Sequence, residues 1–257
     1  MNRRRSLFVA ALVSFFGYNA ALATELRFVT EPLHPFVTES AVTGQVVGPV
    51  AEILQAVCDR IHASCSLEVF PWRRAYIMAE RGEVDGIIPF FHTVEREKNF
   101  YISDMGIESA FSFFTLNASN LKYSQPRDLD GYTVGVYGPS GISSTVETLL
   151  KSGSTGKADI AISNVTVLRM LAGGRYGTAD TAVAVLNRDV GLHLLKTEGI
   201  QGIKWAGDLQ KINYGIGLSR KKVKEEQFHR FNDALRALML EGKIKMILDR
   251  YGLKSTG

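Results

Sequence analysis

Two hydrophobic periodicities alternate along the first third of the chain. Residues 26–30 and 66–70 have the short mixed apolar and polar pattern of strands, whereas the segment that begins at Pro49 repeats apolar residues at helical spacing. A second helix is expected at about 72–81, and a strand that begins near Val84 is expected to stop at Pro89. Such alternation predicts an α/β fold with a mostly parallel sheet covered on both sides.

The pattern starts again after residues 111–116, which are expected to form a strand. The elements expected beyond it are strands at 132–137, 181–186 and 212–218, and helices at 142–150, 165–172, 228–238 and 244–251. A tight loop at 138–141 separates the first of these strands from its helix. Two successive α/β units predict two lobes.

The first 23 residues have the pattern of a secretory signal peptide. Three arginines at positions 3–5 precede an apolar segment at 6–16, and Ala21, Leu22 and Ala23 form a small-residue cleavage motif. The apolar segment is shorter than the roughly 20 residues that a membrane anchor needs. We expect cleavage after Ala23 and export to the periplasm.

Charge argues against nucleic acid as a partner. The formal net charge is +4, but without residues 1–23 the chain has 27 basic and 26 acidic residues. Such a chain has little electrostatic attraction for nucleic acid or an anionic membrane. Its remaining 234 residues are enough for two lobes of about 100 residues each.

Cys58 and Cys65 are the only cysteines of the chain. On one straight helix their Cα atoms would lie about 10 Å apart, which is too far for a disulfide. The helix is expected to end near His62, so the turn after it can bring the two sulfurs together. Export to an oxidising compartment favours a disulfide over two buried free thiols.

The sequence lacks the common motifs of bond-making chemistry. None of its five histidines pairs with another at metal-ligand spacing, and no further cysteines exist to bind zinc. No G-x-S-x-G, P-loop or strand-following G-x-G-x-x-G motif is present. We therefore expect a binding function with no metal and no cofactor.

Several stretches together resemble the solute-binding proteins that serve ABC importers of polar amino acids, known as family 3. The stretches that carry the resemblance are HPFVTESAVTGQVVGPVAEILQAVCDRIHASC, ERGEVDGIIPFFHTVERE, NVTVLRMLAGGRY, YGIGLSRKK and FNDALRALMLEGKIKMILDRYG. The resemblance extends over nearly the whole chain after residue 23, and these stretches follow the family's order and spacing. The C-x6-C pair recurs in some members of this family, which supports the disulfide.

The resemblance implies a type II periplasmic-binding-protein fold. This fold has two lobes, each a mixed sheet flanked by helices, which are joined by two hinge strands and close over a ligand. By analogy, lobe 1 holds residues 24–109 and 208–257, and lobe 2 holds residues 110–207.

The resemblance also implies a ligand site. Arg96, the last residue of T-V-E-R, aligns with the family's arginine that binds the ligand's α-carboxylate. A guanidinium suits this role because its rigid fork donates two parallel hydrogen bonds. Trp72 falls where the family often has an aromatic residue that stacks on the ligand. Ser140 falls where the family often has donors to the carboxylate, in front of a helix N-terminus that favours an anion. The other candidate ligand-binding residues are Glu31, Phe36, Pro89, Phe90, Phe91, Gly141 and Asn187.

Two departures from the family change the expected ligand. Amino-acid binders usually have small or hydroxyl residues before the threonine, where this chain has Pro89, Phe90 and Phe91. They also place an acid after the G-R turn to receive the ligand's ammonium, and here the nearest match is Val185 or its neighbours, with Asn187 and Asp180 as imperfect substitutes. We therefore expect an acid that is less polar than a basic amino acid or lacks an amine.

The resulting hypothesis is a monomeric periplasmic receptor that binds a small carboxylate-bearing ligand and delivers it to an ABC permease. One alternative is an enzyme, because a few proteins of this fold are periplasmic dehydratases, and Glu31, His34 and His92 stand on loops that could face the cleft. A second alternative is a sensor that passes its bound solute to a chemoreceptor or kinase.

Overall fold

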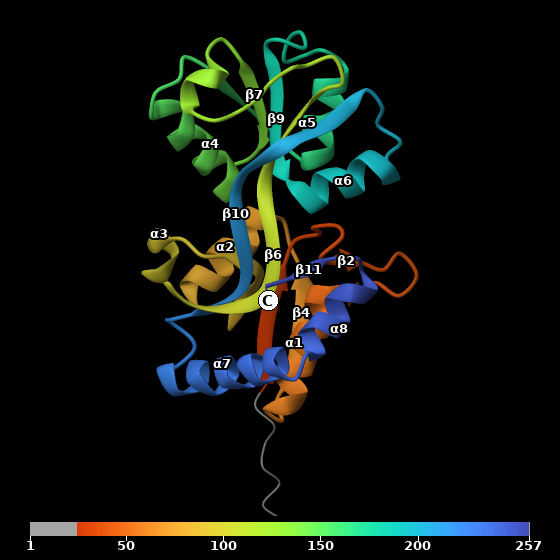
Figure 1. Cartoon of the computed structure of the whole chain (residues 1–257). Helices are drawn as coiled ribbons and strands as arrows, with labels where there is room; N and C mark the ends of the chain where they lie inside the picture. Colours follow the sequence, from red (N-terminus) through yellow and green to blue (C-terminus); the bar gives the residue numbers. More distant parts are fainter. Residues whose placement is uncertain (1–24, 257) are drawn as a thin grey trace, which may run out of the picture.

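The computed structural model describes residues 25–256. The predicted signal peptide and its cleavage site lie outside these residues. The described chain forms two lobes, one above the other in Figure 1, with two long strands running between them. None of the helices in the described part combines the length and the apolar character that crossing a membrane requires.

Lobe 1 is built around three strands that run side by side. Strand β1 (Glu25–Thr30) pairs in parallel with β4 (Ser64–Val69) and β5 (Gly86–Phe91). Phe28 packs in the same cluster as helices α1, α7 and α8, and Val29 in the cluster of α2. The helices of this lobe are α1 (Pro49–Arg60), α2 (Trp72–Arg81), α3 (Val94–Glu97), α7 (Glu225–Leu240) and α8 (Lys243–Arg250).

Short strands complete lobe 1. The hairpin of β2 (Thr38–Glu39) and β3 (Val46–Val47) follows β1, and β11 (Lys254–Ser255) ends the described chain.

Lobe 2 repeats this arrangement around β9 (Ala182–Asn187), which is buried along its whole length. Its odd-numbered residues Val183 and Val185 pack in the cluster of α4, and its even-numbered ones pack in the cluster of α5. This alternation is what a strand covered on both faces requires. The other elements are β7 (Thr133–Tyr137), β8 (Lys157–Ala161), α4 (Gly141–Lys151), α5 (Asn164–Ala172), α6 (Arg188–Thr197) and the short 3-10 helix η1 (Pro126–Leu129).

Two antiparallel strands of 17 residues each connect the lobes. Strands β6 (Phe100–Leu116) and β10 (Ile203–Ser219) pair along their length and join all strands except β2 and β3 into one sheet of order β4-β1-β5-β10-β6-β9-β7-β8, with β11 beside β6. The mixed α/β fold is therefore confirmed. The predicted lobe boundaries, at 109/110 and 207/208, fall inside these two strands and stay a prediction.

Several predicted elements are corrected by the structure. The strand predicted at 111–116 begins at Phe100, and the one predicted at 212–218 begins at Ile203, because polar residues interrupt the apolar pattern where these strands pair with each other. Strand β8 and helix α6 were not predicted. Buried and exposed residues do not alternate along β8, because this strand lies at the edge of the sheet. Helix α6 buries only Val190 and Gly191, so its apolar face is narrow.

Strand β5 does not stop at Pro89, as the sequence pattern suggested, but continues to Phe91. Proline has no N–H to donate to a neighbouring strand. The pairing register with β10 shifts between Gly215 and Gly217, next to the proline, so the ladder skips the position where a donor is missing. The strand thereby carries its aromatic residues to the boundary between the lobes.

The predicted disulfide between Cys58 and Cys65 is present. Cys58 lies near the end of α1 and Cys65 near the start of β4, and their Cα atoms are 6.2 Å apart. Helix α1 ends at Arg60, and the chain turns through His62, whose φ of 54° is left-handed. This turn brings the two sulfurs together.

We expect no free thiol to be alkylated in the unreduced, folded protein. Reduction should lower the free energy of unfolding by about 2 to 3 kcal/mol, because the unfolded chain then regains the entropy that the cross-link removes. The measurement is urea unfolding with and without reductant, and the Cys58→Ala/Cys65→Ala double variant is the control, since reductant should not change its stability. Equal stability of the oxidised and reduced wild type would contradict the expectation.

Candidate functional site

Arg96 lies at the boundary between the lobes because a short helix presents it there. Thr93 is the N-cap of α3, and its hydroxyl accepts a hydrogen bond from the backbone N–H of Arg96 at 3.2 Å. A threonine is a favoured N-cap, and the residue three positions later is the one whose N–H it satisfies. The T-x-x-R spacing is therefore a capped helical turn that fixes the start of the arginine side chain.

The side chain of Arg96 is buried without an anionic partner in the described chain. The residue is only 6% exposed, its Nη1 donates to the carbonyl oxygen of Phe91 at 2.8 Å, and no carboxylate of the described residues lies within 4.0 Å of it. Burial lowers its pKa to about 10, so it still carries its charge at neutral pH. A buried cation without a partner is costly.

Aromatic rings surround the guanidinium of Arg96. Its Cζ lies 4.1 Å from the ring centre of Phe90 and 4.2 Å from that of Phe91, with Trp72 and Tyr76 at 5.4 and 5.9 Å. Ring faces offset part of the cost of removing a cation from water. They cannot replace the two parallel hydrogen bonds that a carboxylate would accept.

Helix α4 of lobe 2 faces this arginine with its N-terminus. Ser140 is the N-cap, and its hydroxyl donates to the carbonyl of Tyr137 at 2.8 Å while its backbone N–H donates to Ser143 Oγ at 2.9 Å. Both donors of Ser140 are thus engaged within the loop. The backbone of Gly141, one residue on, is free of a side chain and comes close to Phe91.

The two lobes touch each other across the cleft. A Cβ at Gly141 would lie 2.1 Å from Cζ of Phe91, so only glycine permits this approach. On the other side of the cleft, the hydroxyl of Tyr137 in lobe 2 donates to Glu31 Oε2 in lobe 1 at 3.0 Å. The described conformation is therefore closed at two places around Arg96.

Glu31 is the one carboxylate that lines the space enclosed by these contacts. Burial raises its pKa from 4.5 to about 7, against the opposing effect of hydrogen bonds from Tyr137 and from the backbone of Trp72. At neutral pH this side chain is poised between its protonated and ionised forms.

Asn187, the proposed substitute for an ammonium acceptor, is fully engaged inside the protein. Its Oδ1 accepts from the backbone N–H groups of Asp189 and Val190, which caps α6, and its Nδ2 donates to Ser109 and Tyr214. Asn187 lines the space beside Arg96, but its side-chain oxygen already accepts two hydrogen bonds.

A small space of about 70 Å³ lies among these residues, and we call it the inner cavity. It brings together eight of the ten candidates from the sequence, which are Glu31, Trp72, Pro89, Phe91, Arg96, Ser140, Gly141 and Asn187. Phe36 and Phe90 do not line it. Phe36 is fully buried against Tyr214, and Phe90 lies in the core behind Arg96.

Sequence reasoning missed several residues of the inner cavity, including Tyr137, Tyr214 and Phe111. Tyr137 ends a parallel strand just before the loop at 138–141, and the carboxyl ends of such strands are where α/β folds form their sites. That signal was available in the sequence. Tyr214 and Phe111 lie within the strands that join the lobes, where no local pattern distinguishes them.

The two histidines considered for catalysis lie elsewhere. His34 stacks on His193 of α6 at 5.4 Å, beside a separate cavity of about 210 Å³ that Glu31 also lines. His92 is exposed and pairs with Glu97 at 2.7 Å. Among the described residues, no group of three potential metal ligands comes together.

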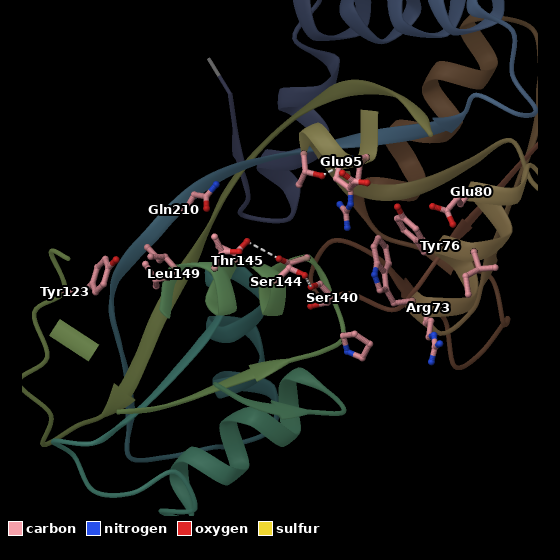
Figure 2. A pocket seen from close by; sticks show the side chains of 18 residues that line it. Arg73, Tyr76, Glu80, Glu95, Tyr123, Ser140, Ser144, Thr145, Leu149 and Gln210 are labelled. Carbon is pink, nitrogen blue, oxygen red and sulfur yellow. Dashed lines mark hydrogen bonds between the residues drawn. The ribbon is translucent and has the colours of Figure 1, made fainter. Parts of the chain in front are cut away.

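A much larger space adjoins the inner cavity on one flank, and we call it the outer groove. It measures about 1070 Å³ and lies between α2 and α3 of lobe 1 and α4 of lobe 2. Figure 2 shows Arg73, Tyr76 and Glu80 along one side and Ser140, Ser144 and Thr145 along the other. Trp72, Arg96, Ser140 and Gly141 line both spaces.

Known proteins resemble this chain in both sequence and fold. A protein of Escherichia coli (strain K12) named as an ABC transporter arginine-binding protein is 26% identical over 133 residues, or 51% of this chain. The matched region is 54% of that protein, so the chain matches about half the length of this relative.

Solved structures share the fold at low sequence identity. An ancestral arginine-binding protein bound to arginine has a TM-score of 0.75 and 21% identity, over 88% of this chain and 97% of that one. An ancestral amino acid-binding protein described as a precursor of cyclohexadienyl dehydratase has a TM-score of 0.73 and 16% identity, over 88% and 94%. The family model of the bacterial extracellular solute-binding proteins, family 3, matches residues 26–254, and the chain belongs to this family.

Proposed function

We propose that this protein is a periplasmic receptor that closes over a small carboxylate-bearing ligand and delivers it to an ABC importer. The observation that carries the proposal is the buried guanidinium of Arg96, which has no anionic partner among the described residues. A ligand carboxylate would supply that partner and two parallel hydrogen bonds. Membership of the family and the named role of the E. coli relative support the delivery step.

The surroundings of Arg96 support an anion at this position. The N-terminus of α4 faces the same space, and the unsatisfied N–H groups of a helix's first turn favour negative charge. Trp72 and Phe91 line the inner cavity beside Arg96, so a bound ligand that covers the guanidinium would remove water from the pair. Exclusion of water strengthens the interaction between the guanidinium and the carboxylate.

Closure of the lobes would couple binding to transport. The contacts between Phe91 and Gly141 and between Tyr137 and Glu31 form only when the lobes meet. A ligand held between Arg96 of lobe 1 and α4 of lobe 2 stabilises this closed state by its contacts to both lobes. In this proposal the chain acts as a monomer in the periplasm, after cleavage following Ala23, and uses no cofactor.

The inner cavity favours a ligand without a free α-ammonium. Asn187 cannot receive one, because its side-chain oxygen already accepts two hydrogen bonds. Glu31 is the one acid on the cavity, and its hydrogen bond with Tyr137 belongs to the closed contact between the lobes. A ligand acid that has no amine, or whose nitrogen is substituted, does not leave a buried ammonium without hydrogen-bond acceptors.

Dehydration of a carboxylated ring is the second candidate function. Glu31, with a pKa near 7 in an enclosed space, has the property of a general acid at neutral pH. The fold is shared with a described precursor of a dehydratase. Incubation with prephenate-like acids tests it, and turnover that is lost in Glu31→Gln would favour the enzyme.

We expect Arg96→Ala to weaken binding of a carboxylate ligand, chosen from a thermal-shift library, by about 2 to 5 kcal/mol. The ligand's anion would otherwise be desolvated without a partner. Arg96→Lys should recover only part of this loss, because an ammonium cannot reproduce the fork. Calorimetry is the measurement, and Arg236→Ala, an exposed arginine on α7, is the matched control. An affinity of Arg96→Ala within about threefold of wild type, or roughly 0.7 kcal/mol, would refute the proposal.

We expect the unliganded wild type to lose stability, relative to Glu31→Gln, as pH rises from 4.5 to above 7. The native state holds the Glu31 proton more tightly than the unfolded chain, so ionisation opposes folding over this range. The variant, which keeps an acceptor for Tyr137, should gain up to about 3 kcal/mol over wild type between pH 4 and pH 8. Urea unfolding across pH measures it, with exposed Glu147→Gln as the control. A difference that is constant with pH would show that Glu31 keeps an ordinary pKa.

A further inference from the structure

The outer groove remains wide although the lobes are in contact. Phe91 meets Gly141 and Glu31 meets Tyr137 across the cleft, yet about 1070 Å³ stays unfilled on the flank lined by α2, α3 and α4. The inner cavity, by comparison, measures about 70 Å³. The groove is therefore a feature of the closed arrangement and not of lobes held apart.

Arg96 stands where the two spaces meet. Trp72, Arg96, Ser140 and Gly141 line both of them, so an acid held by Arg96 has room for only a small group inward. Any longer substituent has to run outward, past Ser140 and along α4.

The length of the groove can be estimated from α4. Its lining includes Ser140 at the N-cap and Leu149 near the last turn, and nine residues of helix rise by about 13 Å. An extended peptide advances by about 3.3 to 3.6 Å per residue. The wall along α4 therefore matches about four residues of extended chain.

The groove offers groups suited to a peptide backbone. The hydroxyls of Ser144 and Thr145 donate to α4 carbonyls, at 3.2 and 3.0 Å, which leaves their oxygens to accept from peptide N–H groups. Gln210 on β10 adds a side-chain amide at the far end, beside Leu149 (Figure 2).

The facing wall, on lobe 1, is aromatic and charged. Trp72 and Tyr76 present rings that can cover apolar side chains. Glu80 and Glu95 lie on the same wall with the exposed Arg73. Glu95 also pairs with Lys98 at 2.6 Å, and Glu80 accepts a hydrogen bond from Asn99 at 3.0 Å.

We propose that the ligand is a short peptide whose C-terminal carboxylate lies on Arg96 and whose chain extends through the outer groove. This inference rests on the proposed function and narrows its substrate class. It also fits the engaged Asn187, because the nitrogen next to the carboxylate is then a neutral amide that requires one hydrogen bond, not an ammonium. The small inner cavity receives the C-terminal side chain.

The test compares free amino acids with peptides that end in the same residue. The probes are L-alanine, L-glutamine and L-arginine, and the tripeptides Gly-Gly-Ala, Gly-Gly-Gln and Gly-Gly-Arg, measured by thermal shift and calorimetry. For at least one pair we expect the tripeptide to bind at least tenfold more tightly than the free amino acid.

Two tryptophan variants on α4 test whether the tripeptide gains its extra affinity in the outer groove. Thr148→Trp fills the groove far from Arg96 and should weaken the tripeptide at least tenfold without changing the free amino acid. Glu147→Trp, at an exposed neighbouring position that does not line the groove, should change neither. Melting of each unliganded variant verifies that it folds as wild type does.

The outcomes separate this inference from the proposed function. If free amino acids bind through Arg96 as tightly as the tripeptides, or Thr148→Trp has no effect on the tripeptides, the peptide inference is overturned and the receptor stands. If Arg96→Ala leaves binding of both kinds of probe unchanged, the proposed ligand site at Arg96 is refuted, and the peptide inference is refuted with it. If no probe of either kind binds, the peptide inference is overturned, and the receptor proposal is overturned as well only if no carboxylate of the thermal-shift library binds.

Discussion

The structure of the cleft depends on one buried charge. The guanidinium of Arg96 is withdrawn from water, lies between the rings of Phe90 and Phe91, and makes a hydrogen bond to one backbone carbonyl. Aromatic faces and one carbonyl offset only part of the cost of that burial. In the proposed function, a ligand that brings a negative charge recovers the remainder of this cost when it binds.

The rest of the fold holds this charge against a second wall, which belongs to the other lobe. Strand β5 continues past Pro89 and carries Phe91 to the boundary, while the capped turn of α3 returns Arg96 to it. The opposing wall is the loop at 138–141 and α4, and only β6 and β10 run between the lobes as continuous strands (Figure 1). Because the two walls belong to different lobes, the proposed closure over a ligand requires a change in the angle between the lobes.

The contacts of Asn187 and Glu31 account for the departures from the amino-acid-binding pattern. Asn187 caps α6 and donates to Ser109 and Tyr214, so its side chain joins α6 to the two strands that connect the lobes. Glu31 takes part in closing the lobes through Tyr137. The polar groups that could recognise a ligand are instead spread along α4 and the outer groove.

By itself the sequence determined the α/β class, most helices and strands, and the disulfide, whereas Arg96 was singled out by the resemblance of T-V-E-R to the family and its helix-capping threonine was found only in the structure. The class, the elements and the disulfide follow from local periodicity and short-range chain geometry, which involve residues close in sequence. Only the tertiary structure decided that Phe36 and Phe90 lie outside the inner cavity, that Asn187 is engaged, and that Tyr137 and Tyr214 line it. Those outcomes depend on pairing between β6 and β10 and on contacts across the cleft, such as Gly141 with Phe91. Because the lobes interleave along the chain, the residues that meet there are far apart in sequence, and no local pattern records their contact.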